Sequence, residues 1–171
     1  MTASGFTRKH GVHTEPRGFN LARDELLALT RKRYYSALAT STPDGLPGVA
    51  TLRYAVTDEF ELVMGTLRTS RKYGNLQRNA NVAVVIWDDD FSIQVEGTFD
   101  EPTGADQGRL RTCFAEEFPK EARLRAGRPS HVYFRITPTW ARFRDLSDEP
   151  PRLLTLDSGT ETETRGTWTA G

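Results

Sequence analysis

Short stretches of alternating apolar and polar residues, separated by strong turn signals, recur along this sequence. In residues 48–57, Ala50, Leu52 and Tyr54 share one face, as the two-residue period of a strand requires. The preceding Pro43-Asp44-Gly45 predicts a turn, because proline presets one backbone angle and glycine accepts a positive φ. By the same reasoning, the predicted strands cover residues 35–40, 48–57, 60–65, 82–87, 91–99 and 131–143.

Three other stretches carry the spacing of helices. Leu110, Phe114 and Phe118 recur at every fourth position, and Asn20 is placed to cap the first helix. Gly97, inside the fifth predicted strand, indicates a bulge or a close backbone approach. The predicted helices cover residues 21–33, 70–78 and 103–118. Six strands with hairpin-type connections predict a mainly β fold, a six-stranded antiparallel barrel with helices at its ends.

Neither end of the chain continues these patterns. Residues 1–19 contain several glycines and a proline without periodicity, which predicts an extended N-terminal arm. Residues 145–171 are rich in proline, threonine and glutamate, which predicts an irregular tail. The folded domain is therefore expected at residues 20–144.

Composition narrows the functional classes. The 171 residues carry 23 basic and 23 acidic side chains, and a balanced charge argues against a dedicated nucleic-acid binder. The apolar runs are all shorter than the roughly 18 residues that a membrane helix needs. The single cysteine, Cys113, excludes an internal disulfide, so a cytoplasmic location is expected.

The segment Gly65-Thr66-Leu67-Arg68-Thr69-Ser70-Arg71-Lys72 carries the clearest chemical signal. A strand-like run ends in hydroxyl-bearing residues, two adjacent cations follow, and a helical pattern begins. This arrangement presents hydroxyl groups, a helix N-terminus and two positive side chains to one point, which is the chemistry of a phosphate site. The segment therefore predicts that a phosphorylated small molecule binds at a strand-to-helix corner.

Several motifs in a fixed order support a family resemblance. They are Gly65-Thr66, Ser70-Arg71-Lys72, Leu76, Asn79, the apolar run 82–87 and Val95-Glu96-Gly97. Together they resemble the pyridoxamine 5′-phosphate oxidase-like superfamily, whose fold is the FMN-binding split β-barrel. The resemblance covers about residues 33–144 and makes residues 20–144 the expected FMN-binding domain.

The resemblance implies a cofactor site and a mode of assembly. In the family, the residues that end the strand and open the helix hold the FMN phosphate, and the preceding strand also lines the flavin. The family builds two equivalent sites across a homodimer interface, so a homodimer with the cofactor at its interface is expected here. A small-molecule substrate and an electron donor are the other expected partners. The matching positions are Gly65, Thr66, Ser70, Arg71 and Lys72, with Thr51, Arg53 and Tyr54 as candidates on the preceding strand.

Two departures from the family pattern concern the vitamin B6 oxidases themselves. Those enzymes use a glutamine five positions before the glycine of Val-Glu-Gly, and Ser92 occupies that position here. Their C-terminal segment carries a tryptophan where this chain has Arg144, and the tail beyond it is unrelated. We therefore expect an FMN-dependent oxidoreductase that lacks pyridoxamine 5′-phosphate oxidase activity.

Other cofactors and functions are compatible with the same fold. The deazaflavin F420 also carries a phosphate and would use the same basic corner. Haem would need an axial histidine, and His131 is the one histidine within the predicted domain, although a lone histidine in a strand is usually structural. A non-catalytic flavin-binding or stress-associated protein is a further alternative. No metal site is expected, and Cys113 is interpreted as an inert small hydrophobic residue.

Overall fold

The computed structural model describes residues 19–147, 150–157 and 160–165, so the predicted arm at 1–19 lies almost wholly outside the described residues. Its elements, in chain order, are α1 (Phe19–Thr30), β1 (Tyr35–Ser41), β2 (Pro47–Val56), β3 (Leu62–Leu67), α2 (Arg71–Leu76), β4 (Asn81–Trp87), β5 (Phe91–Asp100), α3 (Gly104–Glu117), α4 (Pro119–Arg125), β6 (His131–Asp145), β7 (Arg152–Asp157) and β8 (Thr160–Arg165).

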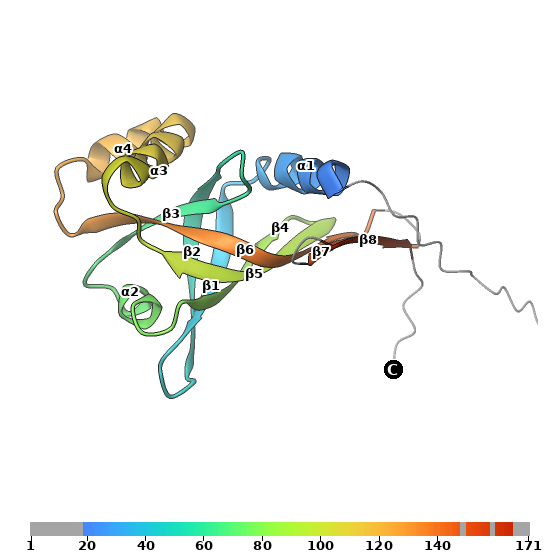
Figure 1. The fold of residues 1–171 in the computed structure, drawn as a ribbon, viewed down its shortest axis with the longest axis horizontal. Helices are drawn as coiled ribbons and strands as arrows, with labels where there is room; N and C mark the ends of the chain where they lie inside the picture. The colour runs from blue at the N-terminus through green and yellow to red at the C-terminus, as the bar shows by residue number, and fades with distance from the viewer. Residues whose placement is uncertain (1–18, 148–149, 158–159, 166–171) are drawn as a thin grey trace, which may run out of the picture.

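Six of the strands close into an antiparallel barrel. The strand order is β3-β2-β1-β4-β5-β6, and β3 pairs with the first half of β6 to complete the ring, from Leu62 opposite Ile136 to Leu67 opposite His131. The split β-barrel predicted from the sequence is confirmed. The helices lie outside the barrel, with α3 and α4 together at one side and α2 near the same end (Figure 1).

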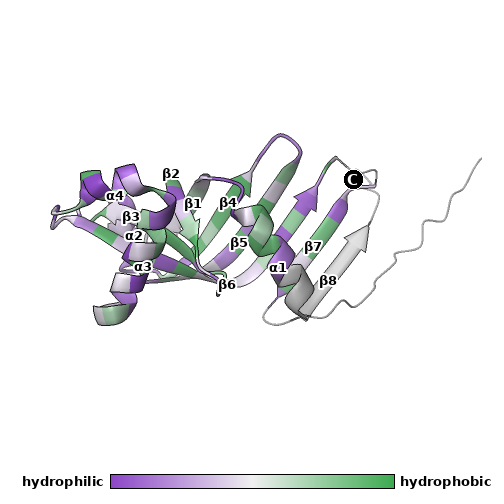
Figure 2. Cartoon of the chain, turned by 90° about the horizontal axis from the view of Figure 1, so that it is seen from above, coloured by the Kyte–Doolittle hydropathy of each residue, from purple (hydrophilic) through white to green (hydrophobic). Residues whose placement is uncertain are grey.

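The barrel interior holds the main apolar cluster. Alternate residues of β2 point into it, and Leu52 and Tyr54 pack there as the alternation predicts. The hydroxyl of Tyr54 donates a hydrogen bond to the backbone oxygen of Thr30 at 2.7 Å, which ties the end of α1 to the barrel. Burial accordingly raises the pKa of Tyr54. Figure 2 shows the resulting alternation of hydrophobic and hydrophilic positions along the strands.

A second, smaller apolar cluster lies on the outer face of the barrel. Leu110 and Phe114 of α3, with Phe118 directly after the helix, pack on Val63 of β3 and Tyr133 of β6. Helix α4 follows α3 directly and was not predicted as a separate element. It begins with a proline in its first turn and ends with basic residues in its last turn, both of which favour a helix at those positions.

The C-terminal segment differs from the predicted irregular tail. Residues 152–157 and 160–165 form β7 and β8, and β7 pairs with the second half of β6. Leu154 of β7 is buried in the main cluster, and Arg152 forms an ion pair with Glu25 of α1 (Nη2 to Oε2, 2.7 Å). The prediction of an irregular tail was wrong for two reasons. The apolar alternation of β7 covers only six residues, which lie between two prolines and a polar run. The strand that pairs with β7 is β6, which is also a strand of the barrel.

Smaller differences concern element ends. Helix α1 begins at Phe19, before the predicted cap Asn20, and it ends at Thr30. Phe60 lies in the turn before β3 with a φ of 62°, so the strand starts two residues later than predicted. The bulge predicted at Gly97 is confirmed by a register shift between Glu96 and Gly97 in the pairing of β5 with β6.

Candidate functional site

The predicted phosphate corner forms where β3 ends and α2 begins. The amide of Ser70 bonds the backbone oxygen of Leu67 at 3.0 Å, which closes a turn. The Ser70 hydroxyl then caps α2 by accepting a hydrogen bond from the amide of Tyr73 at 3.3 Å. Helix α2 has only six residues, so its dipole adds little, and the side chains at the corner must supply most of any attraction for an anion.

Three of the predicted residues converge at this corner. The hydroxyl oxygens of Thr66 and Ser70 lie 3.1 Å apart, and the Lys72 ammonium donates to the Thr66 hydroxyl at 3.4 Å. Thr66 is buried, whereas Ser70 and Lys72 are partly exposed, so the group opens to solvent on one side. Two hydroxyls and an ammonium in this geometry offer the hydrogen-bond donors that phosphate oxygens accept.

The cations around the corner fall into two kinds. Arg68 is neutralised, because it forms an ion pair with Glu101 (Nη2 to Oε1, 2.5 Å) and bonds the hydroxyl of Tyr73. Arg71 and Lys72 have no carboxylate partner among residues 19–147, 150–157 and 160–165. The corner therefore carries uncompensated positive charge, which favours an anion.

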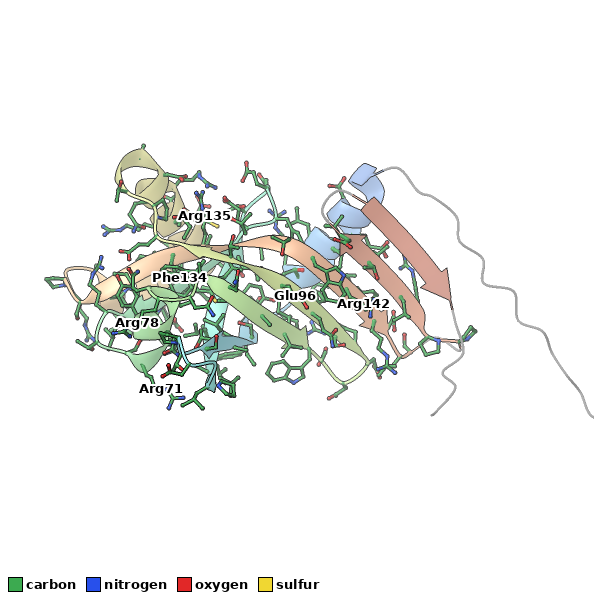
Figure 3. All side chains as sticks on the ribbon, turned by 60° about the horizontal axis from the view of Figure 1, so that its bottom comes forward. Arg71, Arg78, Glu96, Phe134, Arg135 and Arg142 are labelled. Carbon is green, nitrogen blue, oxygen red and sulfur yellow. The ribbon has the colours of Figure 1, made fainter. Side chains whose placement is uncertain are left out.

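Arg71 lies at the β2 side of the corner. Its guanidinium Nη2 is 3.5 Å from the backbone oxygen of Pro47, and it would be 3.0 Å from a Cβ placed on Gly48. Figure 3 shows Arg71 at the α2 end of the molecule, well apart from Glu96 and Arg142. The side chains of Arg71 and Lys72 thus leave the first turn of α2 in two directions, Arg71 toward Pro47 and Lys72 toward Thr66.

Gly65 and Arg53 lie on the outer face of the barrel, opposite to the side chain of Thr66. Arg53 forms an ion pair with Glu121 of α4 (Nε to Oε1, 2.9 Å) and donates a hydrogen bond to the hydroxyl of Tyr35 at 2.8 Å. The hydrogen bond to Tyr35 is the main cause of the raised pKa of Arg53. A Cβ on Gly65 would lie only 2.7 Å from the His131 ring.

The remaining predicted residues are placed elsewhere. Thr51 is exposed on β2, opposite Ala37 of β1, and Tyr54 is buried in the core. Ser92 lies opposite Trp87, at the end of β4 remote from α2, roughly 20 Å along the strand by the usual rise per residue. Within one chain, Ser92 does not join the corner.

Sequence reasoning missed three residues that shape this region. Glu101 and Tyr73 hold Arg68, and Glu121 holds Arg53. Glu101 lies 33 positions from Arg68, and Glu121 lies far along the chain from Arg53, so no local pattern identifies these two carboxylates. Tyr73 lies only five positions from Arg68, but its role depends on Glu101. Among the described residues, no cluster of histidine, cysteine and carboxylate side chains could hold a metal ion, and no helix is both long and apolar enough to cross a membrane.

The closed six-stranded barrel, with a cationic hydroxyl-lined corner between β3 and α2, defines a split-barrel protein. A family model described as pyridoxamine 5′-phosphate oxidase matches residues 22–145. The chain belongs to this family. No curated protein matches the sequence.

Solved structures give the same fold. A conserved hypothetical protein from Mycobacterium tuberculosis is 22% identical with a TM-score of 0.63, covering 77% of this chain and 89% of that one. A pyridoxamine 5′-phosphate oxidase-related, FMN-binding protein from Nostoc punctiforme is 17% identical with a TM-score of 0.66, covering 89% and 99%. A heme-binding protein from Mycobacterium smegmatis is 14% identical with a TM-score of 0.68, covering 84% and 59%.

Proposed function

We propose that this protein binds FMN at the β3–α2 corner and acts as a flavin-dependent oxidoreductase on a small organic substrate. The observation that carries the proposal is the convergence of Thr66, Ser70 and Lys72 at the corner, in a chain of this family. The residues fit a phosphate ester, since they supply hydroxyl donors and a cation that lacks a carboxylate partner within the described residues.

The chain's own residues would bind and orient the cofactor. Lys72 and Arg71 neutralise the phosphate, while the hydroxyls of Thr66 and Ser70 accept or donate hydrogen bonds according to its protonation state. Ser70 keeps its capping bond to Tyr73 through a lone pair while its hydroxyl hydrogen turns to the phosphate. Bound FMN supplies the hydride and electron chemistry, and the protein contributes position and electrostatics.

Assembly as a homodimer completes the proposal. Ser92 and the corner are remote from each other within one chain, so a second copy is needed to bring both to one flavin. Exposed apolar side chains offer a surface for that copy. They are Leu46 in the turn before β2, Val49 in β2 and Trp87 at the end of β4. Light scattering during size-exclusion chromatography should give twice the 19.2 kDa mass of the chain, and a single-chain mass would contradict this part of the proposal.

The cofactor is tested first by an absorbance spectrum of the purified protein, followed by identification of the ligand that heat releases. We expect a flavin spectrum and released FMN. A single deazaflavin band would assign the corner to F420, and a Soret band would assign the protein to haem chemistry. A colourless protein that also fails to bind added FMN would overturn the cofactor proposal.

The enzymatic part is tested separately with the flavin-loaded protein. We expect NADH or NADPH to reduce the bound flavin and a small electron acceptor to reoxidise it over repeated turnovers. Flavin that stays oxidised with either donor would instead identify a non-catalytic flavin-binding protein. We expect no oxidation of pyridoxamine 5′-phosphate, because the serine at position 92 and the arginine at position 144 depart from the oxidase pattern.

A further inference from the structure

A cavity of about 430 Å³ lies on the outer face of the barrel, between α3, α4 and the start of β6. Figure 1 shows α3 and α4 side by side over the end of the barrel where β6 begins. The apolar wall of the cavity comes from Ala115 of α3, Ala122 of α4 and Pro129 of the loop before β6. The volume is within the range of small-molecule sites.

The charged lining of this cavity is entirely basic. Arg111 of α3, Arg125 of α4 and Arg128 of the following loop all contribute, and no acidic residue does. The nearby carboxylate of Glu121 forms an ion pair with Arg125 (3.0 Å) and is shared with Arg53. Arg111 and Arg128 have no carboxylate partner among the described residues. Of the three arginines that line the cavity, Glu121 therefore neutralises only Arg125, and the lining keeps a net positive charge.

His131 lines the cavity and has unused hydrogen-bonding capacity. Both of its ring nitrogens are buried and have no hydrogen-bond partner in the described structure. Its ring packs edge-on against Tyr133 with centroids 4.8 Å apart and lies over Gly65, which has no Cβ to occupy that space. Unpartnered buried polar groups are rare in native proteins, and a water, an ion or a ligand in the cavity would supply the missing hydrogen bonds.

The surroundings keep the His131 ring neutral in the absence of a ligand. Burial is the largest cause, and the charges of Arg125, Arg111 and Arg128 add to it, which together lower the pKa of His131 to about 4. Tyr133 packs beside the ring, and the nearby carboxylate of Glu121 forms ion pairs with Arg53 and Arg125. A bound anion would reverse this balance, because its charge favours protonation of the ring.

We propose that this cavity is a second ligand site, which binds a small organic anion through Arg111, Arg128 and His131. The phosphate or carboxylate group would lie between the two guanidinium groups and accept a hydrogen bond from the ring. The apolar part of the ligand would pack on the alanine and proline wall. This site lies on the face of β3 opposite to the side chain of Thr66, and the proposal does not rest on flavin binding at the corner.

The proposal is tested by following the ring signals of His131 by NMR as pH is varied, with and without phenyl phosphate. His10 and His13 serve as internal references, and a His131→Gln variant assigns the signals. We expect saturating phenyl phosphate to raise the pKa of His131 by at least about one unit. By linkage, a shift of one unit means that the protonated protein binds the anion about tenfold more tightly.

Matched variants decide whether the effect belongs to the cavity. Arg128→Gln, and Arg111→Gln combined with Arg128→Gln, should remove the shift, whereas Arg123→Gln, an exposed charge on α4 outside the lining, should retain it. The single loop substitution covers the case in which the double variant fails to fold. A His131 pKa that phenyl phosphate leaves unchanged would overturn the proposal. So would an equal shift with phenol, or an equal loss in the Arg123→Gln variant.

Two variants test whether the cavity and the β3–α2 corner bind their ligands independently. The Arg111→Gln, Arg128→Gln variant should bind added FMN as the unmodified protein does, and Lys72→Met should still bind phenyl phosphate. Loss of FMN binding in the double variant would make the cavity part of the flavin site and overturn its independence. A protein that binds no FMN but shows the His131 shift would contradict the proposed function and support this site.

Discussion

At the scale of single residues, the structure separates charges that are neutralised from charges that are available. Arg68 and Arg53 resemble site residues in the sequence, but each is held by a carboxylate from a distant element. Lys72 is one of the cations without such a partner among the described residues, and it lies at two hydroxyl groups. Whether a basic side chain has a carboxylate partner, more than its residue type, therefore distinguishes the residues that are candidates for binding a phosphate.

Glu61 illustrates the cost of breaking a neutralised group. Its carboxylate is largely buried and holds Arg109 (2.8 Å) and Arg135 (2.9 Å). A Glu61→Ala substitution should lower the free energy of unfolding by about 1.5–2 kcal/mol, because both guanidinium groups lose charged hydrogen bonds to a buried carboxylate but keep Asp106 as a partner. Urea unfolding measures the loss. Glu59→Ala provides the control, since Glu59 is exposed and reaches Arg109 only at 3.5 Å, so its substitution should change stability by less than about 0.5 kcal/mol.

His131 predicts a dependence of stability on pH. Its folded-state pKa of about 4 lies below the ordinary value of 6.5, so the unfolded chain binds the proton first as pH falls. Stability should therefore fall as pH decreases from about 6.5 to 4. The midpoint of urea unfolding should fall less steeply over this window in His131→Gln than in the unmodified protein. Parallel slopes for the two proteins would show that His131 titrates normally.

At the scale of elements, the barrel follows from patterns that the sequence displays. The alternation of Leu52 and Tyr54 with polar neighbours gives the correct inner face of β2, and Gly97 marks the bulge. The sequence does not reveal β7, because its alternation is short and its pairing partner is the second half of β6. The sequence does not show that this half of β6 is free to pair with another strand. The carboxylate that holds Arg53, Glu121, likewise comes from α4, which follows α3 without a recognisable break.

The bulge in β5 requires the absence of a side chain. A Cβ on Gly97 would lie 2.5 Å from the backbone oxygen of Thr137, which cannot move without distorting the pairing with β6. Gly97→Ala should destabilise the protein by about 2 kcal/mol. Gly108→Ala is the control, because nothing lies within 4 Å of its Cβ position in α3, and it should stabilise by about 0.5–1 kcal/mol. Thermal unfolding of both variants tests the contrast, and similar losses for the two would contradict it.

Strand β7 is expected to contribute to the stability of the barrel. Leu154 is 2% exposed and packs in the main apolar cluster. Leu154→Ala should cost about 2–4 kcal/mol of unfolding free energy, the range for a buried leucine. Leu124→Ala, at a side chain that is 70% exposed, should cost far less. Equal unfolding midpoints for Leu154→Ala and the unmodified protein would show that β7 is not part of the cooperative core.

At the scale of the whole molecule, a balanced charge conceals two local basic regions on opposite faces of β3. One is the corner of Thr66, Ser70 and Lys72, and the other is the cavity over His131. The order of motifs predicts the fold and the first region, because its residues are close in the sequence. The second region depends on residues from α3, α4 and β6 that only the folded chain brings together.

The most direct test of the central claim is a titration of FMN into the unmodified protein, Lys72→Met and Lys120→Met, followed by quenching of flavin fluorescence. Lys120 is an exposed lysine on α4 and serves as the matched control. The corner predicts that Lys72→Met weakens FMN binding at least about tenfold, since a charged hydrogen bond to phosphate contributes roughly 1.5–3 kcal/mol. Lys120→Met should bind as the unmodified protein does. Equal affinity for FMN in all three proteins would show that the corner does not hold the phosphate.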